Sequence, residues 1–302
     1  MATELHISIS AERVFSFGRL NVSNSMLASI IVSSLLILFF VAVNRSLNTK
    51  DKKIRPLQNL AEYIVEGFYG LVQEVTGNHQ KTRFFLPFFI TFFLFIIMNN
   101  WFGLLPGFGT IGFVESETAT EHAVLLQKEI DSPVQTVQAA TDQPAVATEE
   151  EVIVAENADV KEETSEHAKK LFVPYLRAGT ADLNTTLALS LFTMTMVQVV
   201  GIKYLGFSYF KKFFNFKTPI TIFVSILEAV SEFAKIISFS FRLFGNIFAG
   251  EVLLMVIGAL IPLLVPMPFY GLEIFVGFIQ ALVFSMLSVV FYNVATIGHD
   301  EH

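Results

Sequence analysis

Apolar residues run along this chain in stretches long enough to cross a bilayer as helices. Three runs, at 22–43, 84–105 and 183–202, each hold about 20 residues, which suits a hydrocarbon core of ~30 Å. Two longer runs follow at 219–261 and 269–297. The first of these spans ~65 Å as a helix, so it must lie steeply tilted or bend. The pattern predicts an all-α membrane protein with about five transmembrane helices, the last two forming a long tilted hairpin.

The segment between the first and second runs has a different pattern. From Leu57 to Val75, apolar residues recur at i, i+3, i+4 and i+7, and the opposite face carries Gln and Glu. Pro56 is placed to begin a helix and Gly77 to end it. The sequence predicts an amphipathic helix that lies along the membrane surface instead of crossing it.

Basic residues follow the first and third runs. They are Arg45, Lys50, Lys52, Lys53 and Arg55 in one loop, and Lys203, Lys211, Lys212 and Lys217 in the other. Short loops rich in Lys and Arg stay in the cytoplasm. This predicts an external N-terminus, a cytoplasmic-side surface helix and, after five crossings, a cytoplasmic C-terminus that ends in His299–His302.

Composition supports the membrane assignment and isolates one unusual segment. Mean hydropathy is +0.59 and 53% of residues are hydrophobic, which argues against a soluble protein. Of the 27 Asp and Glu residues, 14 lie in 114–167, so the rest of the chain is mildly basic despite the net charge of −7. We expect four regions: an external N-terminal segment at 1–21; the first span, surface helix and second span at 22–112; a loose acidic external insert at 113–171; and a C-terminal membrane domain at 172–302.

The sequence carries no signature of catalytic, redox or nucleotide chemistry. It has no Cys, which excludes disulfides, thiol catalysis and thiolate metal sites. There is no Walker loop, dinucleotide fingerprint or nucleophile elbow. All six His residues lie outside the predicted core spans. We expect no metal, no cofactor and no nucleic-acid partner.

The two long apolar runs contain ionisable residues, and each costs several kcal/mol if it faces lipid. They are Glu228, Glu232, Lys235, Arg242, Glu251 and Glu273. At 100° per residue, Glu228, Lys235 and Asn246 lie within about 40° of Arg242, whereas Glu251 lies about 180° away. Glu273 and Gln280, seven residues apart, share a face that an antiparallel hairpin could turn toward Glu251 and Arg242. A hairpin is plausible because Pro262, Pro266 and Pro268 separate the runs.

Arginine does not lose its proton in proteins, whereas carboxyl groups can bind and release one. Proton-driven machinery needs both a permanent charge and groups that pass the proton on. Three other interpretations stay open. Glu228 and Glu232 could simply neutralise Lys235. Arg242 could bind an anionic substrate in a transporter or channel, which predicts an inverted repeat or helices broken at mid-membrane. The chain could also be an assembly scaffold, in which case its buried charges would be replaceable by apolar residues.

The string FRLFGNIFAGE at 241–251 resembles the hallmark segment of subunit a of F-type ATP synthases. Ala181-Asp182-Leu183-Asn184 and Gln280-Ala281-Leu282 are similar to further family positions, and the order of the predicted elements resembles the family over most of the chain. The acidic insert at 114–167 does not match the usual compact form.

The resemblance implies a proton-conducting stator subunit with two aqueous half-channels, whose last two helices run slanted against a ring of c subunits. Arg242 matches the essential arginine that faces the ring. Glu251 matches a residue of the external half-channel, Glu228 one at the cytoplasmic exit, and Asn246 and Gln280 match polar residues near the arginine. Glu273 stands where many bacterial relatives have His. Asp182 and Asn184 are further candidates for the outer half-channel.

The resemblance also implies partners and a location. The expected partners are the c-ring, the peripheral-stalk b subunits, the remaining ATP synthase complex and the lipid bilayer. The expected location is a bacterial inner membrane, and the transported ion is expected to be H⁺. ATP formation would belong to other subunits, so this chain would be a non-catalytic part of the complex.

Overall fold

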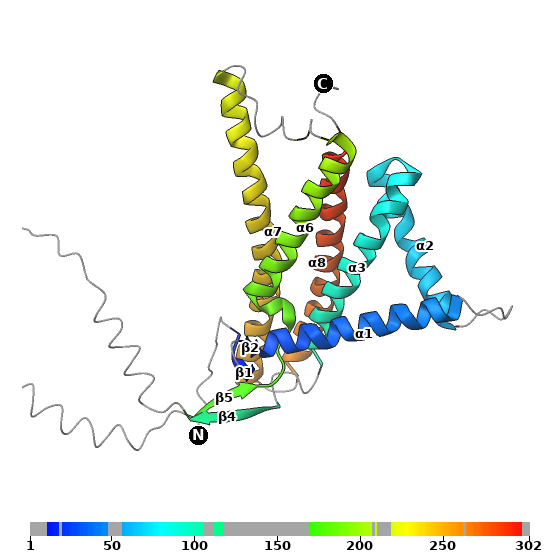
Figure 1. The fold of residues 1–302 in the computed structure, drawn as a ribbon. Coiled ribbons are helices and arrows are strands. Elements are labelled where there is room, and N and C mark those ends of the chain that lie inside the picture. The colour runs from blue at the N-terminus through cyan, green and yellow to red at the C-terminus, as the bar shows by residue number, and fades with distance from the viewer. Residues whose placement is uncertain are drawn as a thin grey trace, which may run out of the picture. The chain divides into compact units, whose positions relative to one another are not determined.

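The computed structural model describes residues 11–17, 20–47, 56–105, 111–116, 170–206, 209, 219–261 and 264–297. Most of this part is helical: α1 (Asn24–Leu47), α2 (Pro56–Thr76), α3 (His79–Gly103), α6 (Leu183–Leu205), α7 (Pro219–Leu260) and α8 (Pro266–Ala295) (Figure 1). All of these except α2 are long and apolar enough to cross a membrane. The predicted all-α membrane fold, with five spans and one amphipathic helix, is confirmed.

The helix ends follow local capping chemistry. The amphipathic helix α2 ends at Thr76, where Gly77 adopts a φ of 62°, a conformation that favours glycine. Helix α3 begins at His79, five residues before the apolar run, because the Asn78 side chain accepts a hydrogen bond from the backbone N–H of Gln80. Helix α8 begins at Pro266 and not at residue 269, since proline is favoured in the first turn of a helix.

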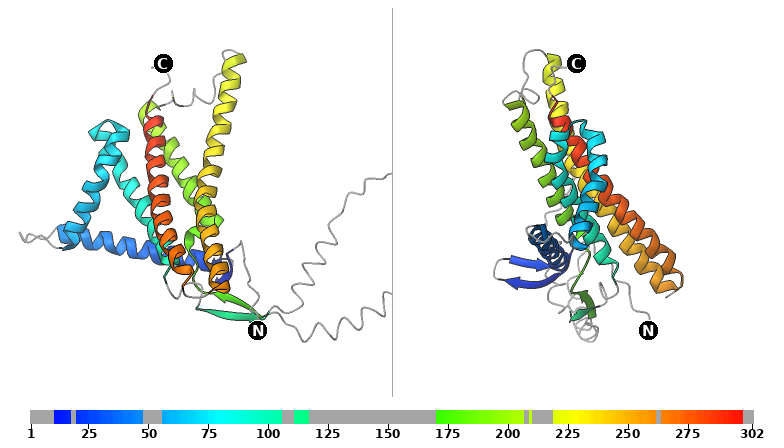
Figure 2. Two further views of the ribbon diagram at one scale, coloured as in Figure 1. Left: turned by 180° about the vertical axis from the view of Figure 1, so that it is seen from behind. Right: turned by 90° about the vertical axis from the view of Figure 1, so that its right-hand side faces the viewer.

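Four helices lie side by side, and one runs across them. Helices α3, α6, α7 and α8 form a slab in which α3 packs along α8 and α6 along α7, whereas α1 runs crosswise to it (Figures 1 and 2). Helix α7 is continuous over 42 residues. A helix of that length is ~63 Å long and fits a hydrocarbon core of ~30 Å only if it tilts strongly. The long apolar run is therefore accommodated without a break.

Phenylalanine dominates the core of the slab. The ring of Phe284 on α8 lies 4.9 Å from that of Phe239 on α7 and 5.8 Å from that of Phe92 on α3, centroid to centroid, in edge-to-face geometry. Helix α2 lies against α3 through Phe68, whose ring centroid is 4.6 Å from that of Phe93. These contacts hold α7 and α8 together as an antiparallel pair and fix the register of their polar side chains.

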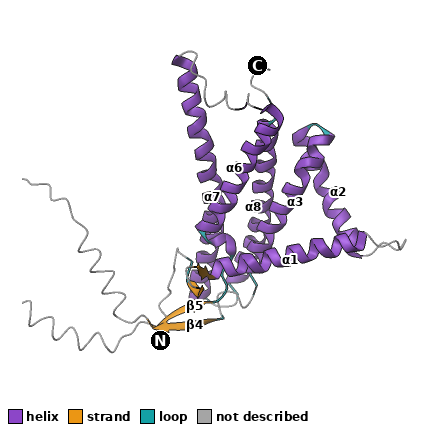
Figure 3. Cartoon of the chain, viewed as in Figure 1, coloured by secondary structure: helices purple, strands orange, loops and turns teal. Residues whose placement is uncertain are grey.

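The structure also contains short strands, which the sequence pattern did not predict (Figure 3). Strands β1 (Arg13–Phe17) and β2 (Leu20–Ser23) form an antiparallel hairpin directly before α1. Residues 112–173 make a separate unit, in which β4 (Gly112–Ser116) pairs with β5 (Lys170–Pro174). The single turn η1 (Gly179–Ala181) leads into α6.

Several predicted features lie outside the described residues. They are the external segment before residue 11, the basic residues from Lys50 to Arg55, most of the acidic insert, the loop residues Lys211, Lys212 and Lys217, Pro262 of the predicted turn, and the tail at 299–302.

Candidate functional site

Arg242 projects from the middle of α7 and is exposed on the surface of the helical slab. Its guanidinium carbon lies 5.8 Å from the centroid of the Phe239 ring, one turn away on the same helix. Within the described residues, no carboxylate forms an ion pair with it. The chain therefore presents a permanent positive charge outward from an apolar helix, without an acidic partner of its own in this part.

Asn246 lies one turn from Arg242 on α7, and Gln280 of α8 lies beside Asn246 at the contact between the two helices. The Asn246 side-chain amide donates a hydrogen bond to Oε1 of Gln280 at 3.5 Å. Gln280 is buried, and its own Nε2 has no hydrogen-bond partner in the described part of the chain. A buried amide donor without a partner is costly, so this position suits a water molecule or a polar group from another molecule.

Glu251, two and a half turns beyond Arg242, is held by a cation that the sequence analysis missed. Arg177, just before η1, donates from Nε to both carboxylate oxygens of Glu251 at 3.0–3.1 Å and from Nη2 to Oε2 at 3.0 Å. The Arg177 side chain is only 8% exposed, whereas Glu251 keeps 30% of its surface exposed. Arg177 also lies 5.8 Å from the centroid of the Phe248 ring. This arginine orients a carboxylate that remains partly exposed at the surface of the chain.

One signal in the sequence could have pointed to Arg177. It stands in a segment predicted to be external, where the charge rule for membrane loops leads one to expect few Arg residues. Arg177 stands in that segment only five residues before Asp182, a candidate site residue, and this combination is the signal. The pairing itself joins residues 74 positions apart and depends on the tertiary fold.

Glu273 on α8 is buried and faces the backbone of α7 at Gly250. A Cβ atom at Gly250 would overlap the Glu273 carboxyl group, so glycine is required at this contact. The same test at Gly245 finds open space. The seven-residue spacing of Glu273 and Gln280 predicted that both would face α7 near Glu251 and Arg242. Glu273 lies against Gly250, the residue directly before Glu251. Gln280 contacts Asn246, which lies one turn from Arg242.

Asp182 and Asn184 lie at the start of α6, beside a cavity. Asp182 caps the helix through a hydrogen bond from the Asn184 backbone N–H to Oδ1 at 3.0 Å, and its Oδ2 accepts a hydrogen bond from the Ser25 hydroxyl at 2.7 Å. Both side chains line a cavity of about 650 Å³, together with Ser23, Met26, Phe95 and Thr185. Asp182 is thus at once a helix cap and a carboxylate next to space that water can occupy.

The polar residues at the end of α3 tie several elements together. Asn100 accepts a hydrogen bond from the Thr180 hydroxyl at 2.6 Å and donates one to the Gly277 carbonyl at 3.2 Å. The partly exposed Trp101 donates to the Ile274 carbonyl at 3.1 Å. These bonds anchor η1 and α8 to α3 close to Glu273.

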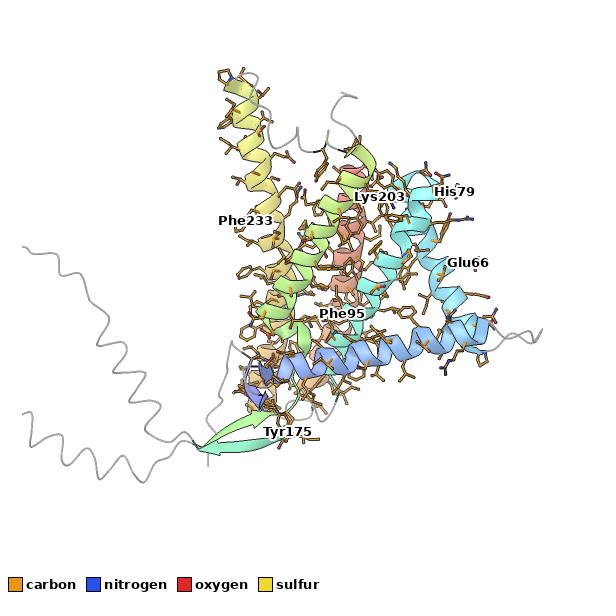
Figure 4. The ribbon with its side chains drawn as sticks, viewed as in Figure 1. Glu66, His79, Phe95, Tyr175, Lys203 and Phe233 are labelled. Carbon is orange, nitrogen blue, oxygen red and sulfur yellow. The ribbon has the colours of Figure 1, made fainter. Side chains whose placement is uncertain are left out.

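The opposite end of the slab carries the basic residues, as the labelled side chains of Lys203 and His79 illustrate (Figure 4). Glu228 and Glu232 lie on the first half of α7, toward this end, and both are partly buried. The predicted i, i+3 pair is present, since the Lys235 ammonium lies 2.9 Å from Oε1 of Glu232. Carboxylates therefore occupy both halves of α7, with Arg242 between them.

A multi-pass helical membrane protein with one exposed intramembrane arginine between two sets of carboxylates belongs to the class of ion-translocating membrane subunits. The ATP synthase A chain family matches residues 26–293, nearly all of the described part. The chain belongs to this family. It is a proton-translocating stator subunit of an ATP synthase complex, which agrees with the family suggested by the sequence.

Proposed function

We propose that this subunit provides two aqueous half-channels and presents Arg242 to a ring of c subunits, so that proton flow drives rotation and ATP synthesis. The observation that carries the proposal is the position of Arg242. It is exposed on a tilted apolar helix and has no ionic partner in the described chain. A charge in that position is costly unless a partner molecule supplies the opposite charge. A carboxylate on a neighbouring rotor would do so.

The outer half-channel would use the carboxylates beyond Arg242. Glu251 is partly exposed while Arg177 orients it, and Glu273 lies against Gly250, the residue directly before Glu251. The cavity beside Asp182 and Asn184 offers an approach for water from the outer side. The proposed outer pathway consists of Glu251, Glu273, Asp182 and Asn184, together with Asn246 and Gln280 near the arginine.

The inner half-channel would use the first half of α7, with Glu228 at the cytoplasmic exit. A ring carboxylate arriving ionised from this side would be held by Arg242 and displaced as the ring turns. It would then take a proton from the outer pathway and travel through lipid in neutral form, because a bare carboxylate there is too costly. Arg242 keeps protons from passing directly between the half-channels, since it does not release its own proton.

The membrane potential supplies the work. Each proton that crosses the full potential yields ~2.3 kcal/mol per 100 mV, so several protons are needed for each ATP. The ion is H⁺ in this proposal, and the chemistry of ATP formation belongs to other subunits.

We place the N-terminus outside, the basic end of the slab in the cytoplasm, and the complex in a bacterial inner membrane. The c-ring would contact the face of α7 that carries Arg242, and the peripheral-stalk b subunits would complete the stator. The basic loops of the sequence support this orientation.

The test is ATP-driven proton pumping in inverted membrane vesicles that carry Arg242→Ala. We expect coupled pumping to be lost while the complex keeps its capacity to hydrolyse ATP. Retained pumping would refute the proposal. The replacement Arg83→Ala, at an exposed arginine on α3, is the matched control and should pump normally.

The transporter interpretation has less support. It predicts helices broken at mid-membrane, whereas α7 runs unbroken from Pro219 to Leu260. The scaffold interpretation predicts that Arg242→Ala leaves pumping intact, so the same experiment decides it.

A further inference from the structure

The inner half of α7 carries a second polar cluster that includes none of the proposed site residues. Oε1 of Glu232 lies 2.9 Å from the Lys235 ammonium, and Oε2 accepts a hydrogen bond from the Gln198 amide of α6 at 3.3 Å. The Gln198 carbonyl oxygen in turn accepts a hydrogen bond from the Tyr209 hydroxyl at 2.8 Å. Two helices and the segment after α6 thus contribute to the surroundings of one carboxylate.

The backbone is shaped to allow this cluster. Tyr209 is buried with its ring against Gly201 of α6, where a Cβ atom would overlap the ring. Glycine at this position lets the tyrosine hydroxyl reach Gln198, which lies nearly one turn earlier on the same helix. The Tyr209 hydroxyl is a donor here, so the Gln198 amide nitrogen is left to donate to Glu232.

The Glu232 side chain is largely but not completely enclosed. It is 12% exposed, and that of Lys235 is 26% exposed. The ammonium also lies 5.1 Å from the centroid of the Phe291 ring on α8. A carboxylate in an apolar span needs such partners, and the part of Glu232 that stays exposed is where water could reach it.

Glu232 also has a suitable position along α7. It stands ten residues before Arg242, which is ~15 Å along the axis and about 80° around it, on the flank that packs against α6. Glu228 lies one turn further from the arginine and about 40° from its face. Glu232 therefore lies between Arg242 and Glu228 along α7, on the way to the inner end of the helix.

We infer that Glu232 is a proton-carrying group of the inner half-channel, and that Gln198, Tyr209 and Lys235 hold it in place. In this step a carboxylate oxygen of Glu232 gains a proton from water that has received it from the ring, forming an O–H bond. That bond then breaks as the proton passes to water at the inner surface. The Lys235 ammonium balances the charge of the carboxylate after the proton has left. The inference rests on the proposed function.

The competing view is that Glu232 and Lys235 only neutralise each other, and two variants separate the views. Glu232→Gln keeps the size and most of the polarity of the side chain but cannot carry a proton. A double replacement, Glu232→Leu with Lys235→Leu, removes both charges. If the pair is only structural, the double variant should translocate protons normally. If Glu232 carries protons, the double variant should remain defective in proton translocation.

The measurement is proton translocation by the whole complex in inverted vesicles, both ATP-driven and passive after removal of the catalytic sector. We expect Glu232→Gln to lower both several-fold with a normal amount of subunit in the membrane, and Glu232→Asp to recover part of the loss. Glu66→Gln, at an exposed carboxylate of α2, is the control and should behave like the unmodified protein.

Normal translocation by Glu232→Gln, or recovery in the double variant, would overturn the inference. Arg242→Ala in the same vesicles keeps the two proposals apart. If Arg242→Ala still pumps, the proposed function itself is wrong. If Arg242→Ala fails while Glu232→Gln pumps normally, only the role of Glu232 is rejected.

Discussion

The two halves of α7 hold their carboxylates by different means. In the inner half, Lys235 of the same helix pairs with Glu232 three residues away. In the outer half, Arg177 reaches Glu251 from a segment that precedes α6. Arg242 lies between the two and pairs with neither group. The inner pair forms wherever α7 is a helix, whereas the outer pair requires that η1, α6 and α7 are already packed.

This difference separates the charges that stabilise the subunit from the charge that is left for a partner. Glu232 and Glu251 each pair with a cation of the same chain, and both carboxylates are partly buried. The arginine that has no carboxylate in the described chain is exposed on α7. Replacements test whether the paired charges mainly stabilise the subunit and whether Arg242 mainly serves proton translocation.

The largest effect on stability is expected from Arg177→Ala. It removes the hydrogen bonds to Glu251 and leaves that carboxylate without its cation, which should cost about 1.5–3 kcal/mol. Thermal unfolding of the detergent-solubilised complex would show the loss, and proton pumping should fall with it. An exchange of the two charges, Arg177→Glu with Glu251→Arg, should restore part of the stability. If Arg177→Ala unfolds like the unmodified protein, the outer pair does not hold the fold.

Gly250→Ala should come next. The new methyl group overlaps the Glu273 carboxyl group, and overpacking of this kind costs about 1–3 kcal/mol. Gly258→Ala on the same helix is the matched control, because a Cβ atom there meets open space. The unfolding midpoints and the pumping rates of the two variants should differ clearly. Equal behaviour would show that α7 and α8 are not closely packed at Glu273.

Ser240→Ala tests an uncharged contact between α6 and α7. The Ser240 hydroxyl lies 3.2 Å from the Thr186 hydroxyl, and both residues are fully buried between α6 and α7. Hydrogen bonds between membrane helices average about 0.6 kcal/mol, so the unfolding midpoint should move only slightly. A loss as large as that of Arg177→Ala would show that the contact is part of a larger network.

Arg242→Ala should have the smallest effect on stability. The side chain is exposed and has no ion pair in the described chain, so the unfolding free energy of the isolated subunit should change by less than about 0.5 kcal/mol. The same variant is expected to abolish pumping. A large loss of stability would show that the guanidinium has a structural partner and would weaken the comparison between the two halves of α7.

Much of the architecture was predictable because it depends on runs of residues. The length of each apolar run defined the spans, and the 3.6-residue period defined α2. The predicted ends were wrong by a few residues at α3 and α8, where Asn78 and Pro266 set the first turn. The strands before α1 and beside the acidic insert escaped prediction because each is only four or five residues long.

The candidate site was predictable only where helical geometry was enough. The helical turn of 100° per residue places Arg242 and Asn246 on one face of α7. The same angle brings Glu232 and Lys235 together three residues apart. The roles of Arg177, Gln198 and Tyr209 could not be obtained in this way, because their partners lie on other elements. The requirement for glycine at position 250 likewise depends on which side chain of α8 lies opposite.

The order of apolar runs and ionisable residues along the chain was enough to predict a membrane protein of tilted helices with a permanent charge among titratable ones. Transfer of apolar side chains out of water and the turn angle of the helix are local properties. Which charge is compensated and which is left exposed depends on how distant segments pack against one another. Ion pairs and glycine contacts between elements act over a few ångströms, and those distances are set by packing between residues that are far apart in the chain.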